Sequence, residues 1–492
     1  MKKQAMSLAV TAALLGGAVS ATGQSMYIDE GGLGEVLIYP FYSAANGNDT
    51  YVQVVNTTSN TKAVKVRIVE GQNSQEVLDF NLYLSPYDEW AAVITASDVL
   101  GGGAIIRTVD NSCTVPQLGV QQGGTNVVLP NGKTRRDQPF FTTLFDDEEP
   151  NDTAAKARTT EGYIELIEMG QLDPNTGLGA DAVHGADGVP LDCTKLVDAW
   201  VKLPAPGGLW TASNGQAQLL SSAAVGESWA GGGLYGYSVL INVDEGTAVG
   251  VDATAIDSFA STALPPALHT EPGSQAPSLE SGTVNSTLFI DGVSVPLTMA
   301  NGLDAFSSLF MTDALINDYV IDPDIDALTD WIVTFPTKKD YDGDDPFTTA
   351  WTGPETRACE IVEVALWDRE EAFEPPPSEG PVFSPAPPGI PPDTFSLCTE
   401  VNVLTFGDGS AVEASELIRY GLPLVEYTEG WAVLSLINTG SSELVGSETL
   451  TGLPALGFAV FEYTNNFLDG GTVKANYEAA VDHKTIEVLE TP

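Results

Sequence analysis

Basic side chains are scarce in this chain. Its 492 residues include 20 Lys and Arg against 67 Asp and Glu, which gives a formal net charge of -47 and a pI near 4.1. Binding to a phosphate backbone requires Lys and Arg to replace condensed counterions. This composition therefore excludes nucleic acid as a partner, and it repels anionic lipid. An acidic surface stays soluble at high salt, so the charge balance favours a marine or halophilic setting or a calcium-loaded surface.

Histidine is also scarce, because the chain has only His184, His269 and His483. Each is predicted to lie at the surface, and three histidines leave little material for a catalytic triad. The segment 226–230 (GESWA) approaches the G-x-S-x-G nucleophile elbow, but it ends in alanine and lacks the strand–turn–helix context. The sequence has no HExxH, Walker loop or dinucleotide fingerprint. We therefore expect a protein that is not an enzyme.

Cysteine is limited to Cys113, Cys193, Cys359 and Cys398. No two of them have C-x2-C spacing, which argues against structural zinc. An even number of cysteines in an exported chain favours two disulfides, although four cysteines allow three connectivities. Proximity in the sequence favours Cys113 with Cys193 and Cys359 with Cys398.

Long apolar runs are absent beyond the N-terminus. Residues 1–21 (MKKQAMSLAVTAALLGGAVSA) begin with two lysines, continue as an apolar run and end in small residues. Val19 and Ala21 suit the -3 and -1 positions of a signal-peptidase site, so 1–21 is predicted to be a signal peptide. A membrane anchor needs about 20 apolar residues, and this run is shorter. The mature chain, with a net charge of -49 once both lysines are removed, is predicted to be secreted to the cell surface or medium, with the periplasm as an alternative.

Short strand-like runs dominate the mature sequence. Runs rich in Val, Ile, Tyr and Phe alternate with turn clusters such as NGND, TTSNT, GQNS and SPYD. In AVKVRIVEG, Val64, Val66 and Ile68 share one face of a strand, and Lys65 and Arg67 lie on the other. This pattern predicts an all-β protein built of antiparallel β-sandwiches, immunoglobulin-like or jelly-roll-like.

The length of the chain predicts two domains. The expected parts are an N-terminal sandwich at 22–264 with an insertion around 101–200, a linker or surface loop at 265–282, and a C-terminal β-rich domain at 283–492 with a proline-rich loop at 374–393. One or two short helices are expected, and the passage 303–320 (LDAFSSLFMTDALINDYV) is the most helical.

An ordered set of motifs carries a resemblance. TYVQVVNTTSNTKAVKVRIVEGQNSQEVLDFNLYLSPYDEW is followed by GYIELIEMG, LINVDEGT, DWIVTFPTK, NVLTFG and ALGFAV. In this set the chain resembles an uncharacterised family of exported cell-surface proteins from marine and related Gram-negative bacteria. The resemblance implies an all-β surface or extracellular protein and supplies no catalytic residues.

Four aspartates cluster directly after the DWIVTFPTK motif. Asp340, Asp342, Asp344 and Asp345 surround Gly343 in KKDYDGDDPF. Calcium takes six to eight oxygen ligands, often from alternating aspartates around a glycine. However, glycine stands fourth here, and Trp351 occupies the position of the bidentate glutamate of an EF-type loop. The segment is thus either a calcium site, which would make calcium a cofactor of the protein, or a solvated acidic turn.

The sequence favours a secreted acidic structural protein. Its acidic loops, among them 146–149 and 322–326, could let divalent cations bridge neighbouring molecules, so the expected partners are further copies or other surface components. The alternative is a secreted carbohydrate-binding or carbohydrate-active module. A glycosidase needs only two suitably spaced carboxylates, and the eight tryptophans could provide a sugar platform. In a sandwich, tryptophans such as Trp90 and Trp331 are more often core residues.

Overall fold

The computed structural model describes most of the chain after residue 23. The described residues are 24–148, 152–200, 231–260, 268–290, 292–341, 343–353, 357–374, 395–422, 427–437 and 443–486, together with the short strands at 210–213, 216–219, 227–228 and 489–490. The predicted signal peptide 1–21, all but Glu374 of the predicted proline-rich loop, and Asp342 lie outside the described residues.

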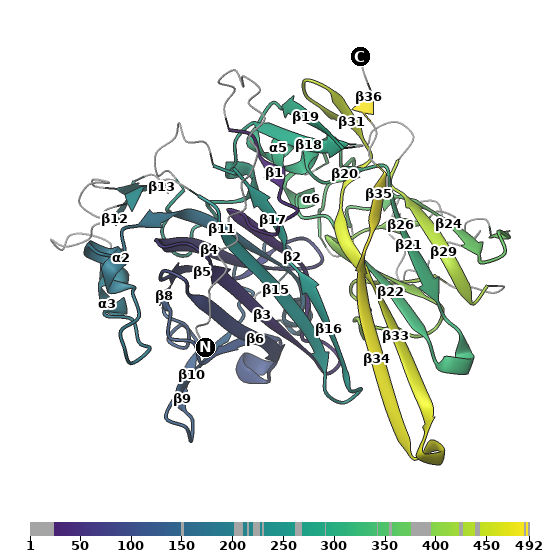
Figure 1. Ribbon diagram of the computed structural model, residues 1–492, viewed down its shortest axis with the longest axis horizontal. Helices are drawn as coiled ribbons and strands as arrows, with labels where there is room; N and C mark the ends of the chain where they lie inside the picture. Colours follow the sequence, from purple (N-terminus) through teal and green to yellow (C-terminus); the bar gives the residue numbers. More distant parts are fainter. Residues whose placement is uncertain are drawn as a thin grey trace, which may run out of the picture.

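Two β-sandwiches lie side by side (Figure 1). Strands make up 49% of the structure and helices 10%, which confirms the predicted all-β class with antiparallel sandwich layers. The first sandwich is built from strands before residue 258 and the second from strands after residue 313. None of the helices in the described part of the chain is long and apolar enough for a transmembrane span.

The first sandwich contains a sheet that we call the shared sheet and a sheet that we call the outer sheet. The shared sheet runs β1 (Tyr27–Ile28), β17 (Thr254–Asp257), β2 (Val36–Ser43), β11 (Glu161–Leu172), β4 (Thr61–Glu70), β5 (Glu76–Leu84), β8 (Cys113–Val115), with β14 (Glu227–Ser228) on β11. The outer sheet runs β16 (Thr247–Asp252), β15 (Leu234–Asn242), β3 (Asn48–Asn56), β6 (Glu89–Ala96), β7 (Ala104–Thr108), β10 (Thr134–Pro139), β9 (Thr125–Val128). Strand β11 falls inside the segment predicted as an insertion, yet it lies between β2 and β4 near the middle of the shared sheet.

The second sandwich pairs two five-stranded sheets. One runs β25 (Phe373–Glu374), β24 (Glu363–Asp368), β29 (Glu429–Ser435), β21 (Ala314–Val320), β35 (Lys484–Ile486). The other runs β28 (Arg419–Leu422), β27 (Val401–Phe406), β22 (Leu328–Thr334), β33 (Leu456–Leu468), β34 (Val473–Asp482). Between them Trp331 is fully buried and its ring centroid lies 5.1 Å from that of Phe406.

Shorter elements cap the sandwiches. The remaining strands are β12 (Trp210–Ser213), β13 (Gln216–Leu219), β18 (Asn285–Ile290), β19 (Val293–Thr298), β20 (Met311–Thr312), β23 (Glu360–Ile361), β26 (Ser396–Leu397), β30 (Glu443–Val445), β31 (Thr449–Thr451), β32 (Leu453–Pro454) and β36 (Leu489–Glu490). The helices are α1 (Thr153–Arg158), α2 (Gly177–Asp181), α3 (Cys193–Ala199), α5 (Gly302–Ser308) and α6 (Lys338–Tyr341). The passage predicted to be helical at 303–320 is helical only in α5 and then becomes strand, because pairing of β21 with β29 outweighs the local helical pattern.

The shared sheet is buried on both faces. Leu37, Val66 and Ile68 pack against the outer sheet, whereas Val36 and Ile167 belong to one core with the second sandwich. Because successive strand residues point to opposite faces, the near-continuous apolar run of β2 (VLIYPFYS) fits burial on both sides. The two sandwiches thus share a continuous core.

Backbone and hydroxyl hydrogen bonds also cross between the sandwiches. Thr334 Oγ1 donates to the Pro40 carbonyl at 2.7 Å, and Tyr163 Oη donates to the Pro336 carbonyl at 2.9 Å. The Val401 amide donates to the Gly71 carbonyl at 2.8 Å. These bonds place the segment after β22 directly against the shared sheet.

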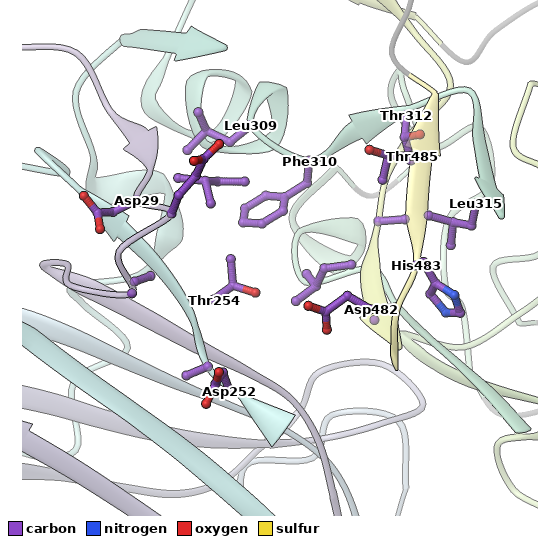
Figure 2. Close-up of a pocket in the computed structure, with 18 of the residues that line it drawn as sticks. Asp29, Asp252, Thr254, Leu309, Phe310, Thr312, Leu315, Asp482, His483 and Thr485 are labelled. Atoms are coloured by element: carbon purple, nitrogen blue, oxygen red, sulfur yellow. The ribbon is translucent and has the colours of Figure 1, made fainter. Parts of the chain in front are cut away.

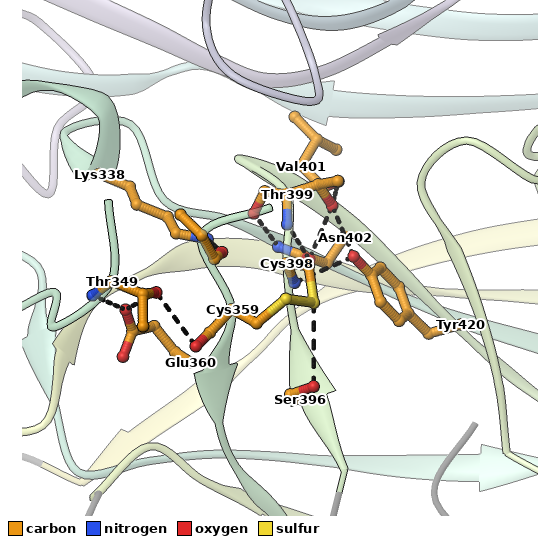
Figure 3. The surroundings of a disulfide bond; sticks show 11 residues. Lys338, Thr349, Cys359, Glu360, Ser396, Cys398, Thr399, Val401, Asn402 and Tyr420 are labelled. Carbon is orange, nitrogen blue, oxygen red and sulfur yellow. Dashed lines mark hydrogen bonds between the residues drawn. A yellow bond between two sulfur atoms is a disulfide. The ribbon is translucent and has the colours of Figure 1, made fainter. Parts of the chain in front are cut away.

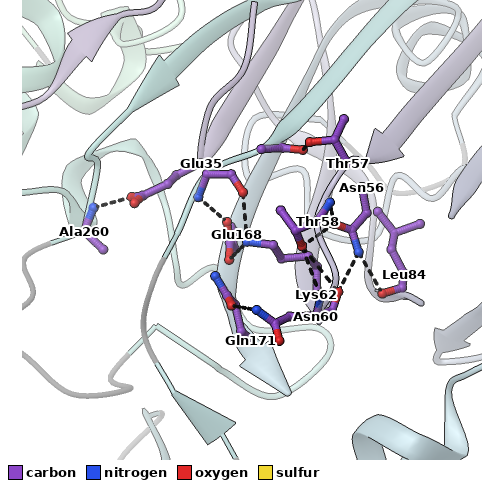
Figure 4. Close-up of polar contacts among 12 residues, drawn as sticks. Glu35, Asn56, Thr57, Thr58, Asn60, Lys62, Leu84, Glu168, Gln171 and Ala260 are labelled. Atoms are coloured by element: carbon purple, nitrogen blue, oxygen red, sulfur yellow. Dashed lines mark hydrogen bonds and ion pairs between the residues drawn. The ribbon is translucent and has the colours of Figure 1, made fainter. Parts of the chain in front are cut away.

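Charged side chains are also buried in the shared sheet. Lys65 and Arg67 lie opposite the Val64 face, as the alternation predicts, but Lys65 is buried and Arg67 is largely buried, and they pair with Asp79 and Glu165. At the end of the sheet, Lys62 is fully buried, and its Nζ donates to Glu168 Oε1 at 2.7 Å and to the Gly232 carbonyl at 2.8 Å (Figure 4). A buried charge is tolerated only when it is paired in this way.

Both predicted disulfides are present. Cys113 joins Cys193 with a Cα–Cα distance of 5.3 Å, and Cys359 joins Cys398 with a Cα–Cα distance of 3.8 Å. The first disulfide fixes α3 to β8 at one end of the shared sheet. The second joins two segments of the second sandwich that flank the groove described below.

The segment predicted as a linker or surface loop, 265–282, is described from Leu268 onward and packs against the shared sheet. The Thr270 carbonyl accepts a hydrogen bond from Asn81 Nδ2 at 2.9 Å. His269 is fully buried and its Nε2 lies 3.1 Å from Tyr83 Oη. The prediction that all three histidines lie at the surface is therefore wrong for His269, and also for His483.

Candidate functional site

The aspartate cluster, for which the sequence left open a calcium site or a solvated acidic turn, is spread over helix α6 and the turn that follows it. Asp340 belongs to α6, and Asp344 and Asp345 are exposed. The Asp344 amide donates to the Tyr341 carbonyl at 3.0 Å, so the backbone folds into a local turn. Among the described residues, which exclude Asp342, no three Asp, Glu, His or Cys side chains gather as a metal ion requires.

Helix α6 instead lies in a polar groove between the two sandwiches. Tyr341 and Phe347 anchor the segment, because they are buried and their rings lie 5.9 Å apart. Lys339 lines two cavities of about 440 Å³ and about 220 Å³, on either side of the helix. We call the larger one the Trp351 cavity. Its volume falls in the range of about 300–1,000 Å³ that is usual for small-molecule sites.

The Trp351 cavity combines one aromatic ring with charges of both signs. Its chemically active lining consists of Asp146, Asp147, Lys338, Lys339, Trp351 and Glu400. The first sandwich contributes the two aspartates from the loop after β10, and the second contributes the other four. The site therefore exists only because the sandwiches are packed together.

The Cys359–Cys398 disulfide lies near residues that line this cavity, among them Lys338 and Thr349 (Figure 3). Lys338 Nζ donates to the Ala358 carbonyl at 2.6 Å, beside Cys359. Thr349 Oγ1 donates to the Cys359 carbonyl at 3.1 Å. Glu400 follows two residues after Cys398, so the disulfide holds the Lys338 and Glu400 segments near one another.

Glu400 is the unusual titratable group of the cavity. It is 2% exposed, and its Oε2 has no hydrogen-bond partner among the described residues. Burial raises the pKa of Glu400 to about 8, with Lys338 and Lys339 opposing the shift and Asp340 reinforcing it. Burial lowers the pKa of Lys338 in turn, while Glu400 opposes that shift. At neutral pH, Glu400 is mostly a neutral acid that can donate a hydrogen bond.

Trp351 is held by a chain of charged groups. Its Nε1 donates to Asp147 Oδ2 at 2.7 Å, and Asp147 Oδ1 accepts from Arg158 Nη1 at 2.8 Å. Arg158 also donates to Glu70 Oε1 at 2.8 Å, and its Cζ lies 5.9 Å over the Trp351 ring. The ring is therefore fixed before any ligand arrives. Asp147 and Glu148, from the acidic segment after β10, are thus counterions of buried Arg158.

The smaller cavity, on the other side of α6, is an ion-pair pocket. Arg67 Nη1 donates to Glu165 Oε2 at 2.7 Å, and Arg67 Nε donates to Glu76 Oε2 at 3.3 Å. The Asp340 side chain is exposed at the rim of the pocket. Desolvation by the surrounding protein nevertheless raises the pKa of Asp340 to about 6, and the negative charge of Glu165 raises it further. The internal pairing leaves this pocket few free groups for a ligand.

A third cavity, of about 360 Å³, also lies between the sandwiches and includes His483 (Figure 2). His483 Nε2 donates to the Ile332 carbonyl at 3.0 Å, and its Nδ1 lies 3.2 Å from Asn317 Nδ2. Burial lowers the pKa of His483 to about 4. With both ring nitrogens engaged and the ring neutral, His483 is a structural residue and not a general base.

Sequence reasoning missed the residues that give the groove its character. In the sequence, Trp351 stood out only because it occupies the position where an EF-type calcium loop has its glutamate. Nothing in the segment CTEVN distinguishes Glu400 from the other acidic residues. Arg158 is the groove residue that the sequence could have pointed to, because a rare cation in so acidic a chain is a good candidate for a buried ion pair. Trp90 and Trp331, predicted to be core residues, are 1% and 0% exposed.

Comparisons of the chain with protein-family models, with curated proteins and with solved structures gave no match. The fold and the groove therefore define only a class, a double β-sandwich with two disulfides and an interdomain polar groove.

Proposed function

We propose that the protein is a secreted acidic structural component of the cell surface or extracellular matrix, whose copies associate laterally with the help of divalent cations such as calcium. The observation that carries the proposal is an unprotected sheet edge at β9. Supporting features are the strongly negative charge, the two disulfides and the sequence resemblance to exported surface proteins.

Strand β9 forms the free edge of the outer sheet. All four of its residues are exposed, with Val128 at 73%, and none of them is charged. The Leu129 amide donates to the Lys133 carbonyl at 2.8 Å, toward the β10 side of the hairpin. Because amides alternate in direction along a strand, those of Asn126 and Val128 point away from β10.

Such an edge can pair with another strand. Natural proteins usually protect exposed edges with lysine, proline or bulges, and β9 has none of these. Figure 1 shows the β9–β10 hairpin extending from the body of the first sandwich, where a second copy can reach it. The -47 charge opposes close approach at low salt. A divalent cation at the acidic surface would weaken this repulsion.

Light scattering at several protein concentrations, with and without calcium, tests this proposal. We expect the wild-type protein to form oligomers and calcium to strengthen them. Val128→Lys should shift the protein to the monomer by at least about tenfold in dissociation constant, because a charge is placed in the strand-pairing seam. Val128→Pro, which removes an outward amide while keeping the β10 ladder, should act in the same direction.

Val243→Lys is the matched control. Val243 is 74% exposed and follows β15, so this substitution adds the same charge at equal exposure but away from the β9 edge. It should leave the association unchanged. A wild-type protein that is monomeric in every condition, with and without calcium, contradicts the proposal.

A further inference from the structure

We infer that the Trp351 cavity is a binding site for a neutral carbohydrate, with Trp351 as the stacking surface and Glu400 as a hydrogen-bond donor. This inference does not depend on the proposed structural function. It requires binding only, with no bond made or broken.

The balance of charges in the cavity selects the class of ligand. Lys338 and Lys339 disfavour a cation, whereas Asp146 and Asp147 disfavour an anion. A neutral polyol avoids both conflicts, because each hydroxyl can donate to a carboxylate and accept from an ammonium or a threonine hydroxyl. The cavity of about 440 Å³ is partly open to solvent, so a saccharide can enter it.

Trp351 supplies the apolar contact that a sugar ring needs. It is partly buried and lines the cavity, and Asp147 fixes its indole nitrogen. Arg158 lies over one face of the ring, which leaves the other face for the C–H groups of a ligand. The stacked pair Trp367 and Trp431 is less suitable, because the two rings lie 4.3 Å apart and cover each other.

Glu400 is the independent sign of a ligand. A polar atom that is buried without a partner is costly. Glu400 lines this cavity and its Oε2 is such an atom, so a turn of the carboxyl group is needed to bring Oε2 to the cavity surface. The charged groups that act on Glu400 are Lys338, Lys339 and Asp340 from the α6 segment and Glu70 from β4. A ligand hydroxyl would satisfy the carboxyl group that these neighbours leave unpaired.

Calorimetric titration of the full-length mature protein with maltose, cellobiose, lactose and N,N′-diacetylchitobiose tests the inference. Using the Val128→Lys variant throughout keeps self-association out of the measurement. We expect at least one of these neutral disaccharides to bind at pH 7. Trp351→Ala should weaken that binding about tenfold or more, because the stacking surface is lost.

The pH dependence separates a role of Glu400 from a purely structural one. Between pH 7 and pH 9, Glu400 loses its proton, and the wild-type affinity should fall by about tenfold. Glu400→Gln keeps a donor of the same shape at all pH values, so this variant should bind at pH 7 within about threefold of the wild-type affinity and should not weaken at pH 9. Circular dichroism of each variant checks that the fold is intact.

Trp367→Ala is the control for a partly buried tryptophan outside the groove, and it should leave the affinity unchanged. Three outcomes would overturn the inference. These are no binding of any of the four disaccharides, binding that Trp351→Ala leaves unaffected or that does not weaken in the wild-type protein between pH 7 and pH 9, or tighter binding of an anionic uronate disaccharide than of every neutral one.

Discussion

Replacing Lys62 with methionine is expected to lower the free energy of unfolding by about 3–5 kcal/mol, because the substitution leaves a buried carboxylate without its counterion. Lys62 and Glu168 both have side chains with 0% exposure, and their charged atoms are 2.7 Å apart. Glu168 Oε2 also accepts from the Gly232 amide at 2.9 Å, which cannot replace a positive charge. Urea unfolding at pH 7 measures the effect.

Two further variants show whether the charge is responsible. Adding Glu168→Gln to Lys62→Met should recover most of the loss, because the remaining amide is neutral and can still accept from Gly232. Lys195→Met should cost no more than about 1 kcal/mol, since Lys195 is 57% exposed where it pairs with Asp181. A double variant as unstable as Lys62→Met alone would point to lost packing of the lysine stem instead.

Raising the pH from about 5 to about 9 is expected to destabilise the protein. Burial raises the pKa of Glu35 to about 8 from an ordinary value of 4.5; the Ala260 amide opposes the shift and Glu168 reinforces it. Burial likewise raises the pKa of Glu400 to about 8. The Ala260 amide donates to Glu35 Oε2 at 2.8 Å (Figure 4), so one oxygen of Glu35 is satisfied without a cation.

The direction of this pH effect follows from whether the folded or the unfolded protein holds the proton. Between about pH 4.5 and pH 8 the folded protein keeps a proton on each carboxyl that the unfolded chain has released. The stabilisation is therefore complete below about pH 4.5 and is lost as the pH rises through about 8. Each carboxyl contributes at most on the order of 4–5 kcal/mol, and local opening reduces this value.

Thermal unfolding from pH 5 to pH 9 provides the measurement. Glu35→Gln and Glu400→Gln should each flatten the decline and raise the midpoint at pH 9, while changing little at pH 5. Glu443→Gln removes an exposed carboxyl and serves as the control for the loss of one negative charge. A midpoint that stays constant or rises toward pH 9 in the wild-type protein would show that these carboxyls are ionised in the fold.

Local patterns in the sequence were sufficient to predict the strands. The period-two alternation in β4 and the turn clusters around it depend only on neighbouring residues, so they are visible without a partner. The disulfide pairs followed from their number and proximity. The helix predicted for 303–320 is wrong in its second half. That half forms strand β21, because it pairs with β29, which starts more than 100 residues later in the chain.

The groove could not be predicted from the sequence in the same way. Asp147 and Trp351 are separated by 204 positions, and they meet only because α6 docks against the first sandwich. The calcium hypothesis for Asp340, Asp342, Asp344 and Asp345 rests on their spacing around one glycine, and it stays a prediction because Asp342 lies outside the described residues. The chain contains 67 acidic residues, so identity alone could not single out Glu400.

The sequence by itself determined the charge, the class of secondary structure and the absence of familiar catalytic motifs, and it favoured the disulfide pairing that the structure shows. The net charge is a sum over all residues, and the other properties are patterns among residues that lie close together in the sequence. Only the tertiary structure decided that both faces of the shared sheet are buried, that scarce cations such as Lys62 and Arg158 neutralise buried acids, and that Trp351 and Glu400 line one cavity. The physical reason is that burial and electrostatic environment depend on which distant segments pack together, and packing is a property of the whole fold.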